Sequence, residues 1–237
     1  MGQEGVLAGT HEGEPGLPRG RSGLPAEAVA AAQRDRLLRS VIASVAREGY
    51  ANATVADIVR GARVSRAAFY AHFTGKEDCF LAATWEGGLL MIGQVSAAAR
   101  RLTPAAPAAD VLRASIAAFL GFLAAEPAFA RAFYVDMPAA GRRAARQSEA
   151  GLRSFARSNR AWHDRARRDH PAWPAVPWEA YYALAGATAA LVRAEVSHDR
   201  IETVPALEET VVAMHLAVLA GQPWPYPQPP DSAYCTS

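Results

Sequence analysis

Residues 54–73 read TVADIVRGARVSRAAFYAHF, and this stretch decides the fold. Thr54, followed three residues later by Asp57, resembles a capping box with Asp where Glu or Gln is usual. Ser65 offers a second good N-cap. The pattern predicts two short helices joined by a turn at residues 61–64. Helices this short bury little apolar surface by themselves, so they need a longer helix to pack against.

Longer helices are predicted on both sides of this stretch. Residues 25–49 carry apolar side chains at the spacing of one helical face, and a long helix restarts at Lys76 and continues to about Leu102. In the second short helix, Phe69 and Phe73 lie one turn apart and are expected to face inward, which leaves the opposite face exposed. Two short helices that lean on a third form the helix-turn-helix pattern, whose second helix enters the major groove of DNA.

This stretch resembles the DNA-binding domain of the TetR family of bacterial transcription regulators. The resemblance covers about residues 34–82, where the matching positions fall in register without gaps. These positions are Gly49, Tyr50, Thr54, Val55, Ile58, Val64, Ser65, Phe69, Tyr70, His72, Phe73, Lys76 and Glu77. The resemblance implies an all-α fold of about nine helices, with an N-terminal three-helix DNA-binding domain and a C-terminal helical domain for ligand binding and dimerisation.

Four regions are predicted along the chain. Residues 1–25 are rich in glycine and proline and lack the apolar run of a secretory signal, so we expect a disordered tail. Residues 26–75 are the expected helix-turn-helix domain, and residues 76–222 are the expected ligand-binding and dimerisation domain. The proline-rich end, residues 223–237, argues against further helix.

The resemblance also implies which side chains contact DNA. Phosphate contacts supply most of the affinity, and base-edge contacts supply the sequence choice. Arg66 and Ala67 would reach base edges, because a guanidinium can fork onto guanine and a methyl group can meet the thymine methyl. The implied phosphate contacts fall on Thr54, Tyr70, His72 and Lys76, and Arg63 and Ser65 belong to the same candidate surface. Residues 27–76 hold eight Lys or Arg against four Asp or Glu, which fits a DNA-facing surface but also a solvated helix.

Several of these residues have a structural alternative. Tyr70 could pack its ring on the first helix, and His72 could only cap the second. Arg63 stands where the family usually has glycine with a positive φ, so either the turn differs or a left-handed conformation costs about 1 kcal/mol. Lys76 is the only lysine among 25 Lys and Arg residues, which favours a specific role for it.

Composition excludes several classes of protein. The chain has 51% hydrophobic and 20% charged residues, which is enough for a core and argues against global disorder. The net charge is only +2, and no uninterrupted apolar run is long enough for a membrane span. Two cysteines, Cys79 and Cys235, provide no disulfide framework or zinc cluster, so we expect a cytoplasmic protein without a metal or cofactor. Cys79 could be a redox sensor, but a buried core position is favoured.

The C-terminal domain is rich in aromatic residues at helical spacing. Such a set is typical of a core, whereas the resemblance implies a cavity for a small apolar or aromatic effector. The candidate ligand residues are Phe119, Phe122, Phe133, Asp136, Trp162, His163, Trp178 and Tyr182.

The last two helices, predicted at residues 178–198 and 205–221, carry small residues and two apolar stripes. One stripe can face the core, and the other then needs a partner. In the family these helices pair with their copies, which implies a homodimer; an internal helix buried all round is the alternative. The candidate interface residues are Ala183, Ala187, Ala190, Leu207, Val211, Met214 and Val218.

These features predict a homodimeric regulator that binds a palindromic operator in double-stranded DNA, as a repressor released by a small effector. An enzyme is disfavoured, because the sequence contains no HExxH, no GxSxG, no glycine-rich phosphate loop and no cysteine cluster. The other alternative is a helical ligand-binding or scaffolding protein with impaired DNA binding, for which Arg63 is the best support.

Overall fold

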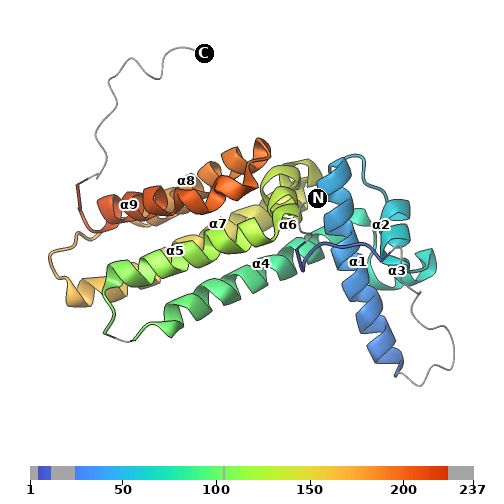
Figure 1. Ribbon diagram of the computed structural model, residues 1–237, viewed down its shortest axis with the longest axis horizontal. Coiled ribbons are helices and arrows are strands. Elements are labelled where there is room, and N and C mark those ends of the chain that lie inside the picture. The colour runs from blue at the N-terminus through green and yellow to red at the C-terminus, as the bar shows by residue number, and fades with distance from the viewer. Residues whose placement is uncertain (1–4, 12–24, 104, 224–237) are drawn as a thin grey trace, which may run out of the picture.

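The computed structural model describes residues 5–11, 25–103 and 105–223, and within these ranges the chain is helical and has no strand (Figure 1). The α-helices are α1 (Ala26–Glu48), α2 (Val55–Ala62), α3 (Arg66–His72), α4 (Lys76–Arg101), α5 (Ala108–Ala125), α6 (Pro127–Arg131), α7 (Arg142–Asp169), α8 (Trp178–Ser197) and α9 (Glu208–Leu219). A π-helical turn, η1 (Ala132–Asp136), and the 3-10 turns η2 (Met137–Ala140) and η3 (Ile201–Leu207) complete them. The predicted all-α fold is confirmed.

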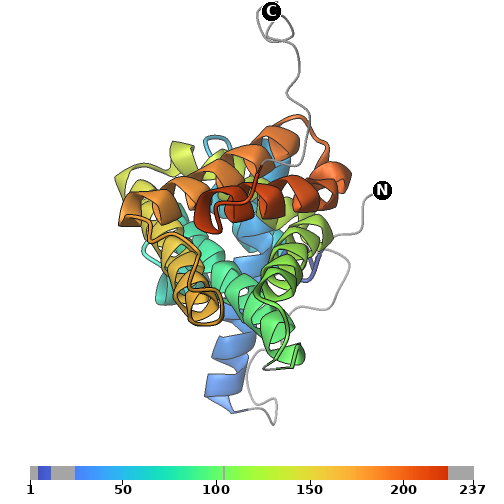
Figure 2. The same cartoon turned by 90° about the vertical axis from the view of Figure 1, so that its left-hand side faces the viewer.

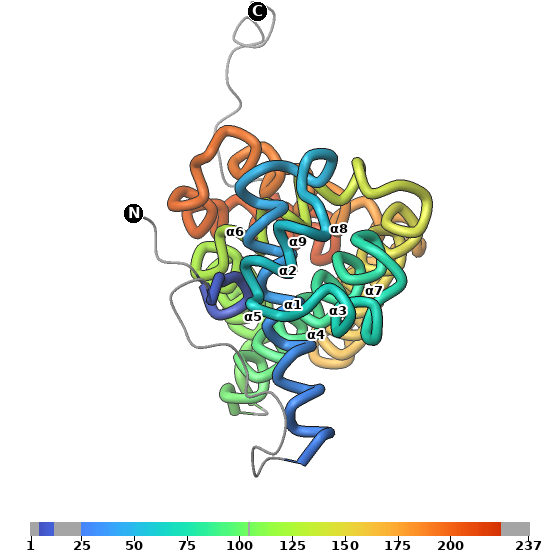
Figure 3. The backbone as a smooth tube through the Cα atoms, turned by 90° about the vertical axis from the view of Figure 1, so that its right-hand side faces the viewer, coloured from blue at the N-terminus to red at the C-terminus, as the bar shows by residue number. Residues whose placement is uncertain are grey.

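Helices α1, α2 and α3 form an N-terminal unit at one end of the molecule (Figures 1 and 3). The buried face of α1 includes Leu37, Val41 and Ile42, and α1 packs against both α2 and α4. Ile58 of α2 and Phe69 of α3 are fully buried in the same core. Each short helix therefore gains from α1 the apolar partner that it cannot supply itself.

The two short helices begin at the N-caps that the sequence predicts. Thr54 Oγ1 accepts the Asp57 N–H at 3.2 Å, and the Asp57 carboxylate accepts the Thr54 N–H at 3.0 Å, which completes the capping box. Ser65 Oγ accepts the Ala68 N–H at 3.1 Å. Each cap of this kind stabilises its helix by about 1 kcal/mol. Both N-cap predictions are confirmed.

Helix α4 leads from the N-terminal unit into the C-terminal helices. Cys79 is fully buried near its start, and burial raises the pKa of the thiol, so this residue is the core position that the sequence favours. Gly87 lies against the Phe129 ring of α6, where an added Cβ would come within 2.2 Å of a ring carbon. The two helices approach this closely only because residue 87 has no side chain.

The C-terminal helices form a layered bundle beside the N-terminal unit (Figures 1 and 2). Helix α5 packs against α4, α9 and η3, and α7 pairs with α8. By length and composition α5 could cross a membrane, but it is packed among these helices. The helix predicted at residues 205–221 is α-helical only from Glu208, because its first part is the 3-10 turn η3.

The N-terminal segment 5–11 is bound to the body of the protein. The N–H groups of Val6 and Leu7 donate to the Glu126 carboxylate at 2.7 and 2.9 Å, at the corner between α5 and α6. The prediction of a disordered tail is therefore wrong for this segment. The tail composition concealed it, because the partner that orders the segment lies more than a hundred residues away in the sequence.

The same segment also reaches the DNA-binding unit. The His11 N–H donates to the Gly61 carbonyl in the last turn of α2 at 2.7 Å. The N-terminal segment thus connects α2 with the α5–α6 corner. The remaining parts of the two predicted tails that lie outside the described residues are 1–4, 12–24 and 224–237.

Candidate nucleic-acid interface

Helices α2 and α3 lie at one end of the molecule (Figure 3), and one face of α3 is exposed there. Phe69 and Phe73 are buried, whereas Arg66, Ala67 and Tyr70 are exposed. This is the division of faces that the sequence predicts for the second short helix. A helix face of this composition can enter a major groove and reach base edges and phosphates. The individual DNA contacts stay predictions.

Arg66 and Tyr70 lie one turn apart on this face and touch. The guanidinium carbon of Arg66 lies 5.9 Å from the centroid of the Tyr70 ring, within the range of a cation–π contact. The Tyr70 ring meets Phe69 edge-on at 5.3 Å between centroids and is 50% exposed. Since these ring contacts lie within α3, they favour the DNA-facing role of Tyr70 over packing on α1.

The turn between α2 and α3 is left-handed although it lacks the family's glycine. Arg63 has φ 51° and ψ 42°. Its N–H donates to the Arg60 carbonyl at 3.1 Å, and the Val64 N–H donates to the Val59 carbonyl at 3.1 Å, which closes the end of α2. Arg63 therefore adopts the conformation that costs about 1 kcal/mol for a non-glycine residue. Because the turn is retained, the main support for impaired DNA binding is weakened.

Thr54 and His72 lie at opposite ends of this two-helix unit. The Thr54 hydroxyl donates to the Asp57 carboxylate at 2.5 Å, and this bond is the main cause of the lowered pKa of that carboxyl. His72 is partly buried in the last turn of α3, with its ring centroid 6.2 Å from that of Phe73. The C-cap residue of α3 is Phe73 and His72 is the basic residue of the last turn, so the structure leaves both roles of His72 open.

Lys76 has a role that the sequence does not predict. Its ammonium donates to the carbonyls of Tyr50 at 2.6 Å, Ala53 at 2.8 Å and Ala51 at 3.4 Å. The ammonium also lies 4.4 Å from the centroid of the Tyr50 ring, and burial lowers the pKa of Lys76. An ammonium has three N–H donors, and all three are engaged within the chain. In this structure Lys76 ties the start of α4 to the loop before α2, and the expected phosphate contact stays a prediction.

The aromatic candidates for a ligand cavity pack against one another. Phe122 meets Phe129 at 5.9 Å between ring centroids, and Phe129 stacks on Phe133 at 5.4 Å. Phe119 meets Phe155 edge-on at 5.2 Å. Phe119 and Phe122 are buried. In this structure these rings form core, which is the alternative that their helical spacing leaves open.

Asp136, a candidate ligand residue, makes a hydrogen bond to the α1–α3 unit. Its Oδ1 accepts the Tyr50 N–H at 3.1 Å, which joins η1 to the loop after α1. The carboxyl is buried, and this burial raises its pKa. Asp136 is therefore a contact between the two halves of the chain.

The other polar candidates also have partners inside the chain. His163 Nδ1 lies 2.8 Å from the Tyr181 hydroxyl, and burial lowers the pKa of this histidine. Trp162 Nε1 donates to the Ala108 carbonyl at 2.9 Å. Tyr182 donates to a carboxylate of α7. These contacts hold α7 against α5 and α8, but they leave the buried Nε2 of His163 without a hydrogen-bond partner among the described residues.

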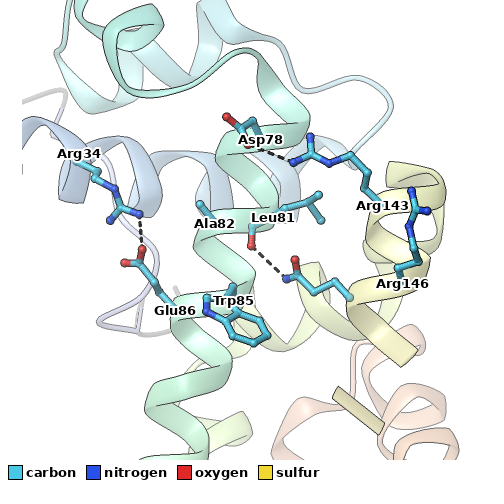
Figure 4. A pocket seen from close by; sticks show the side chains of 9 residues that line it. Arg34, Asp78, Leu81, Ala82, Trp85, Glu86, Arg143 and Arg146 are labelled. Atoms are coloured by element: carbon cyan, nitrogen blue, oxygen red, sulfur yellow. Dashed lines mark hydrogen bonds and ion pairs between the residues drawn. The ribbon is translucent and has the colours of Figure 1, made fainter. Parts of the chain in front are cut away.

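A groove of about 510 Å³ lies across α4, between α1 and α7 (Figure 4). It is lined by Arg34, Asp78, Leu81, Ala82, Trp85, Glu86, Arg143, Arg146 and Gln147. A smaller pocket of about 260 Å³ lies between the end of α7 and the start of α8 and includes Trp178. Of the candidate ligand residues, only Trp178 lines either of these two pockets. The sequence analysis missed the groove, although Trp85, Leu89 and Ile92 at helical spacing were a signal for an apolar face.

The candidate dimer residues divide between surface and core. Partly or fully exposed are Ala183, Ala187, Ala190, Leu207, Met214 and Val218. Val211 is 0% exposed within the single chain and belongs to the main core. Its assignment to a dimer interface is wrong, because a side chain enclosed by its own chain cannot meet a partner. The small residues of α8 and the 41% exposed Val218 of α9 remain available.

Comparisons with known proteins agree with this arrangement. Residues 38–83 match the family described as bacterial regulatory proteins, tetR family. No curated protein matches the chain. Among solved structures, FadR from Bacillus halodurans, a fatty acid degradation regulator, is 18% identical, with a TM-score of 0.68 over 80% of this chain and 99% of its own.

Two further structures are similar in fold. The transcriptional regulator FadR from Bacillus subtilis, solved with stearoyl-CoA, is 16% identical, with a TM-score of 0.68 over 79% of this chain and 98% of its own. SmeT, the repressor of the Stenotrophomonas maltophilia multidrug efflux pump SmeDEF, is 20% identical, with a TM-score of 0.62 over 83% of this chain and 97% of its own.

The N-terminal unit is thus a TetR-type helix-turn-helix domain, and the whole chain has the fold of solved TetR-like regulators. Residues 38–83 therefore carry the DNA-binding domain described for the tetR family of bacterial regulatory proteins, and this match supports a DNA-binding regulator.

Proposed function

We propose that the protein is a homodimeric, cytoplasmic repressor that binds a palindromic operator through α3 and leaves it when a small effector binds. The observation that carries the DNA-binding part is the exposed face of α3, with Arg66 and Ala67 at its start and Phe69 anchoring the opposite side. In a dimer, two copies of α3 must lie about 34 Å apart to reach successive major-groove turns, so the target is an imperfect palindrome.

DNA retention tests this part directly. Genomic fragments that the purified protein retains should share an inverted repeat, and its isolated operator should bind with strong salt dependence. A protein that retains no fragment above the background of a non-specific control would favour the alternative, a ligand-binding or scaffolding protein with impaired DNA binding.

The α8–α9 surface supports the dimer. Ala183, Ala187 and Ala190 of α8 are small and at least partly exposed, which lets a helix of a second copy approach closely, and an isologous two-fold contact satisfies both surfaces at once. Ala187→Arg should place an unpaired charge in this contact and split the dimer in sedimentation. Ala161→Arg, on the exposed face of α7, is the matched control and should leave the dimer intact.

Fold similarity supports an effector. The Bacillus subtilis FadR structure contains stearoyl-CoA, and this chain shares its fold over most of its length. An effector releases DNA only if it binds the non-operator conformation more tightly, and a coupling of about 1 to 3 kcal/mol changes operator affinity about 5- to 150-fold. Operator release and thermal shift, measured with the same compound library, test this part without the dimer assay.

A further inference from the structure

The groove across α4 combines apolar and positively charged walls (Figure 4). Its floor is formed by Leu81, Ala82 and Trp85 of α4. Arg34 extends from α1 on one side, and Arg143 and Arg146 extend from α7 on the other. The groove therefore opens at the junction of the DNA-binding unit and the C-terminal helices, where a bound molecule touches elements of both.

The arginines of the groove differ in their partners. Arg34 pairs with Glu86, and Arg143 lies 3.5 Å from the Glu77 carboxylate and 3.3 Å from that of Asp78. Arg146 makes no ion pair with any carboxylate in the described part of the chain. An anion in the groove can therefore bind the guanidinium of Arg146, which has no carboxylate partner. It can also bind that of Arg143, because its ion pairs with exposed carboxylates are weak.

Beyond the groove, an exposed apolar stripe runs along α4 from Trp85, which lines the groove. Trp85 is 53% exposed, and Leu89 and Ile92, which follow it at helical spacing, are 50% and 37% exposed. Seven residues of helix span about 10 Å, so this stripe is as long as a medium-chain hydrocarbon or two fused rings. Large apolar side chains exposed in a row favour an apolar ligand, because covering them removes their surface from water.

We propose that this groove binds an anionic amphiphile, with its anionic head at Arg146 and Arg143 and its apolar body along Trp85, Leu89 and Ile92. The proposal rests on the proposed function and gives the effector a place and a chemical class. The head can be a carboxylate or the phosphates of an acyl thioester, since a guanidinium binds both.

The position of Arg143 connects ligand binding in the groove with operator affinity. Asp78, a partner of Arg143, also accepts the Thr74 N–H at 3.1 Å, in the turn that follows α3. An anionic head that takes Arg143 away from Asp78 removes a contact between α7 and the end of the helix-turn-helix unit. The orientation of α3 is then less restrained by the C-terminal helices, which lowers operator affinity.

Binding measurements with defined probes test the site. We expect dodecanoate to bind the full-length protein in calorimetry, with dodecanol, its uncharged counterpart, at least about tenfold weaker. Hexanoate should bind more weakly than dodecanoate, by at most about fourfold per methylene removed. Stearoyl-CoA, as a second arm, distinguishes a phosphate-bearing head from a carboxylate.

Two arginines of α7 provide the matched pair. Arg146→Gln should weaken binding of the best anionic probe about tenfold, whereas Arg157→Gln, on an exposed position of the same helix, should not change it. Equal binding of dodecanoate and dodecanol, an unchanged affinity in Arg146→Gln, or no binding of any probe at millimolar concentration would each overturn the groove proposal. Probe binding that depends on Arg146 but leaves operator affinity unchanged would refute the effector role alone and leave the groove standing.

A second inference rests on the N-terminal segment 5–11. Glu126 is only 7% exposed, and its carboxylate accepts two backbone N–H groups from this segment. Ala8 is 5% exposed, and Leu7 packs against the core. At its other end the segment bonds to the Gly61 carbonyl, four residues before the N-cap of α3. Its two ends are thus fixed to different halves of the chain.

We infer that this segment is a strap that limits the movement of the helix-turn-helix unit relative to the C-terminal helices. Removal of residues 1–11 should increase amide hydrogen exchange in α2 and α3 about tenfold or more, because local opening there loses a tether. Removal of residues 1–4 alone keeps the strap and is the control. Glu126→Gln should reproduce part of the effect, because an amide offers only one oxygen to two donors. Unchanged exchange in α2 and α3 after removal of residues 1–11 would overturn the strap.

Discussion

The α1–α3 unit and the C-terminal helices acquire their structure from interactions of different range. In the α1–α3 unit, the Thr54–Asp57 capping box and the Ser65 cap each join residues three positions apart, and both form as the sequence predicts. In the C-terminal helices, the partner of a side chain is often remote: that of Asp136 is Tyr50. Local signals therefore specify where helices begin and which face is buried, while distant contacts decide what an inward-facing side chain does.

The largest effect should come from the core of α3. Phe69→Ala should lower the free energy of unfolding by about 3 to 5 kcal/mol, because Phe69 is fully buried beneath the recognition face. Tyr70→Ala, at the next residue, removes a half-exposed ring and should cost less than about 1 kcal/mol while still weakening operator binding. Chemical denaturation separates the two. Similar losses for both variants would mean that α3 does not divide into a core face and a DNA face.

Arg66 tests the DNA face itself. Arg66→Ala should cost about 1 to 3 kcal/mol of binding to the best operator and relax preference at one base pair, if its guanidinium forks onto guanine. Lys76→Ala, whose ammonium faces backbone carbonyls, should leave base preference unchanged and lower the stability of the loop after α1. Operator libraries measured with both variants provide the comparison. A wild-type base preference in the Arg66 variant would remove this residue from the set that reads bases.

Gly87 tests a distant contact of the C-terminal half. Gly87→Ala should destabilise the protein by about 1 to 3 kcal/mol, because the new Cβ would meet the Phe129 ring. Gly93→Ala, in the same helix with open space around it, should stabilise the protein by about 0.5 to 1 kcal/mol. Opposite signs in thermal unfolding would confirm that contact between helices, not helix propensity, sets the outcome. A gain for Gly87→Ala would contradict the close approach.

The smallest effect is expected in the turn between α2 and α3. Arg63→Gly should stabilise the protein by at most about 1 kcal/mol, because glycine adopts the left-handed conformation without a Cβ clash. Arg63→Ala keeps the clash and should give no gain. If both variants lose the same operator affinity, the Arg63 side chain contacts DNA; if neither loses affinity, its role is confined to the turn.

The same contrast explains how much the sequence could predict. The exposed face of α3 follows from helical spacing, the core position of Cys79 is what the family resemblance implies, and both are present. The docking of residues 5–11 on Glu126 could not be predicted, because nothing in a glycine-rich stretch indicates which distant side chain accepts its backbone hydrogen bonds. Val211 shows the limit within a helix: spacing identifies an apolar stripe, but not whether the stripe meets its own core or a second chain.

The backbone carbonyls that bind the Lys76 ammonium make cleavage at this residue a measure of local unfolding. Lys76 is the only lysine of the chain, so a protease that cuts after lysine has one site, between residues 76 and 77. That bond lies at the start of α4, and the side chain that the protease must grasp is bound to the carbonyls of Tyr50 and Ala53. Cleavage therefore requires local unfolding at the junction of the two halves. Its rate, read as the appearance of fragments 1–76 and 77–237, would report how operator DNA or an effector tightens or loosens this junction, without any label on the protein.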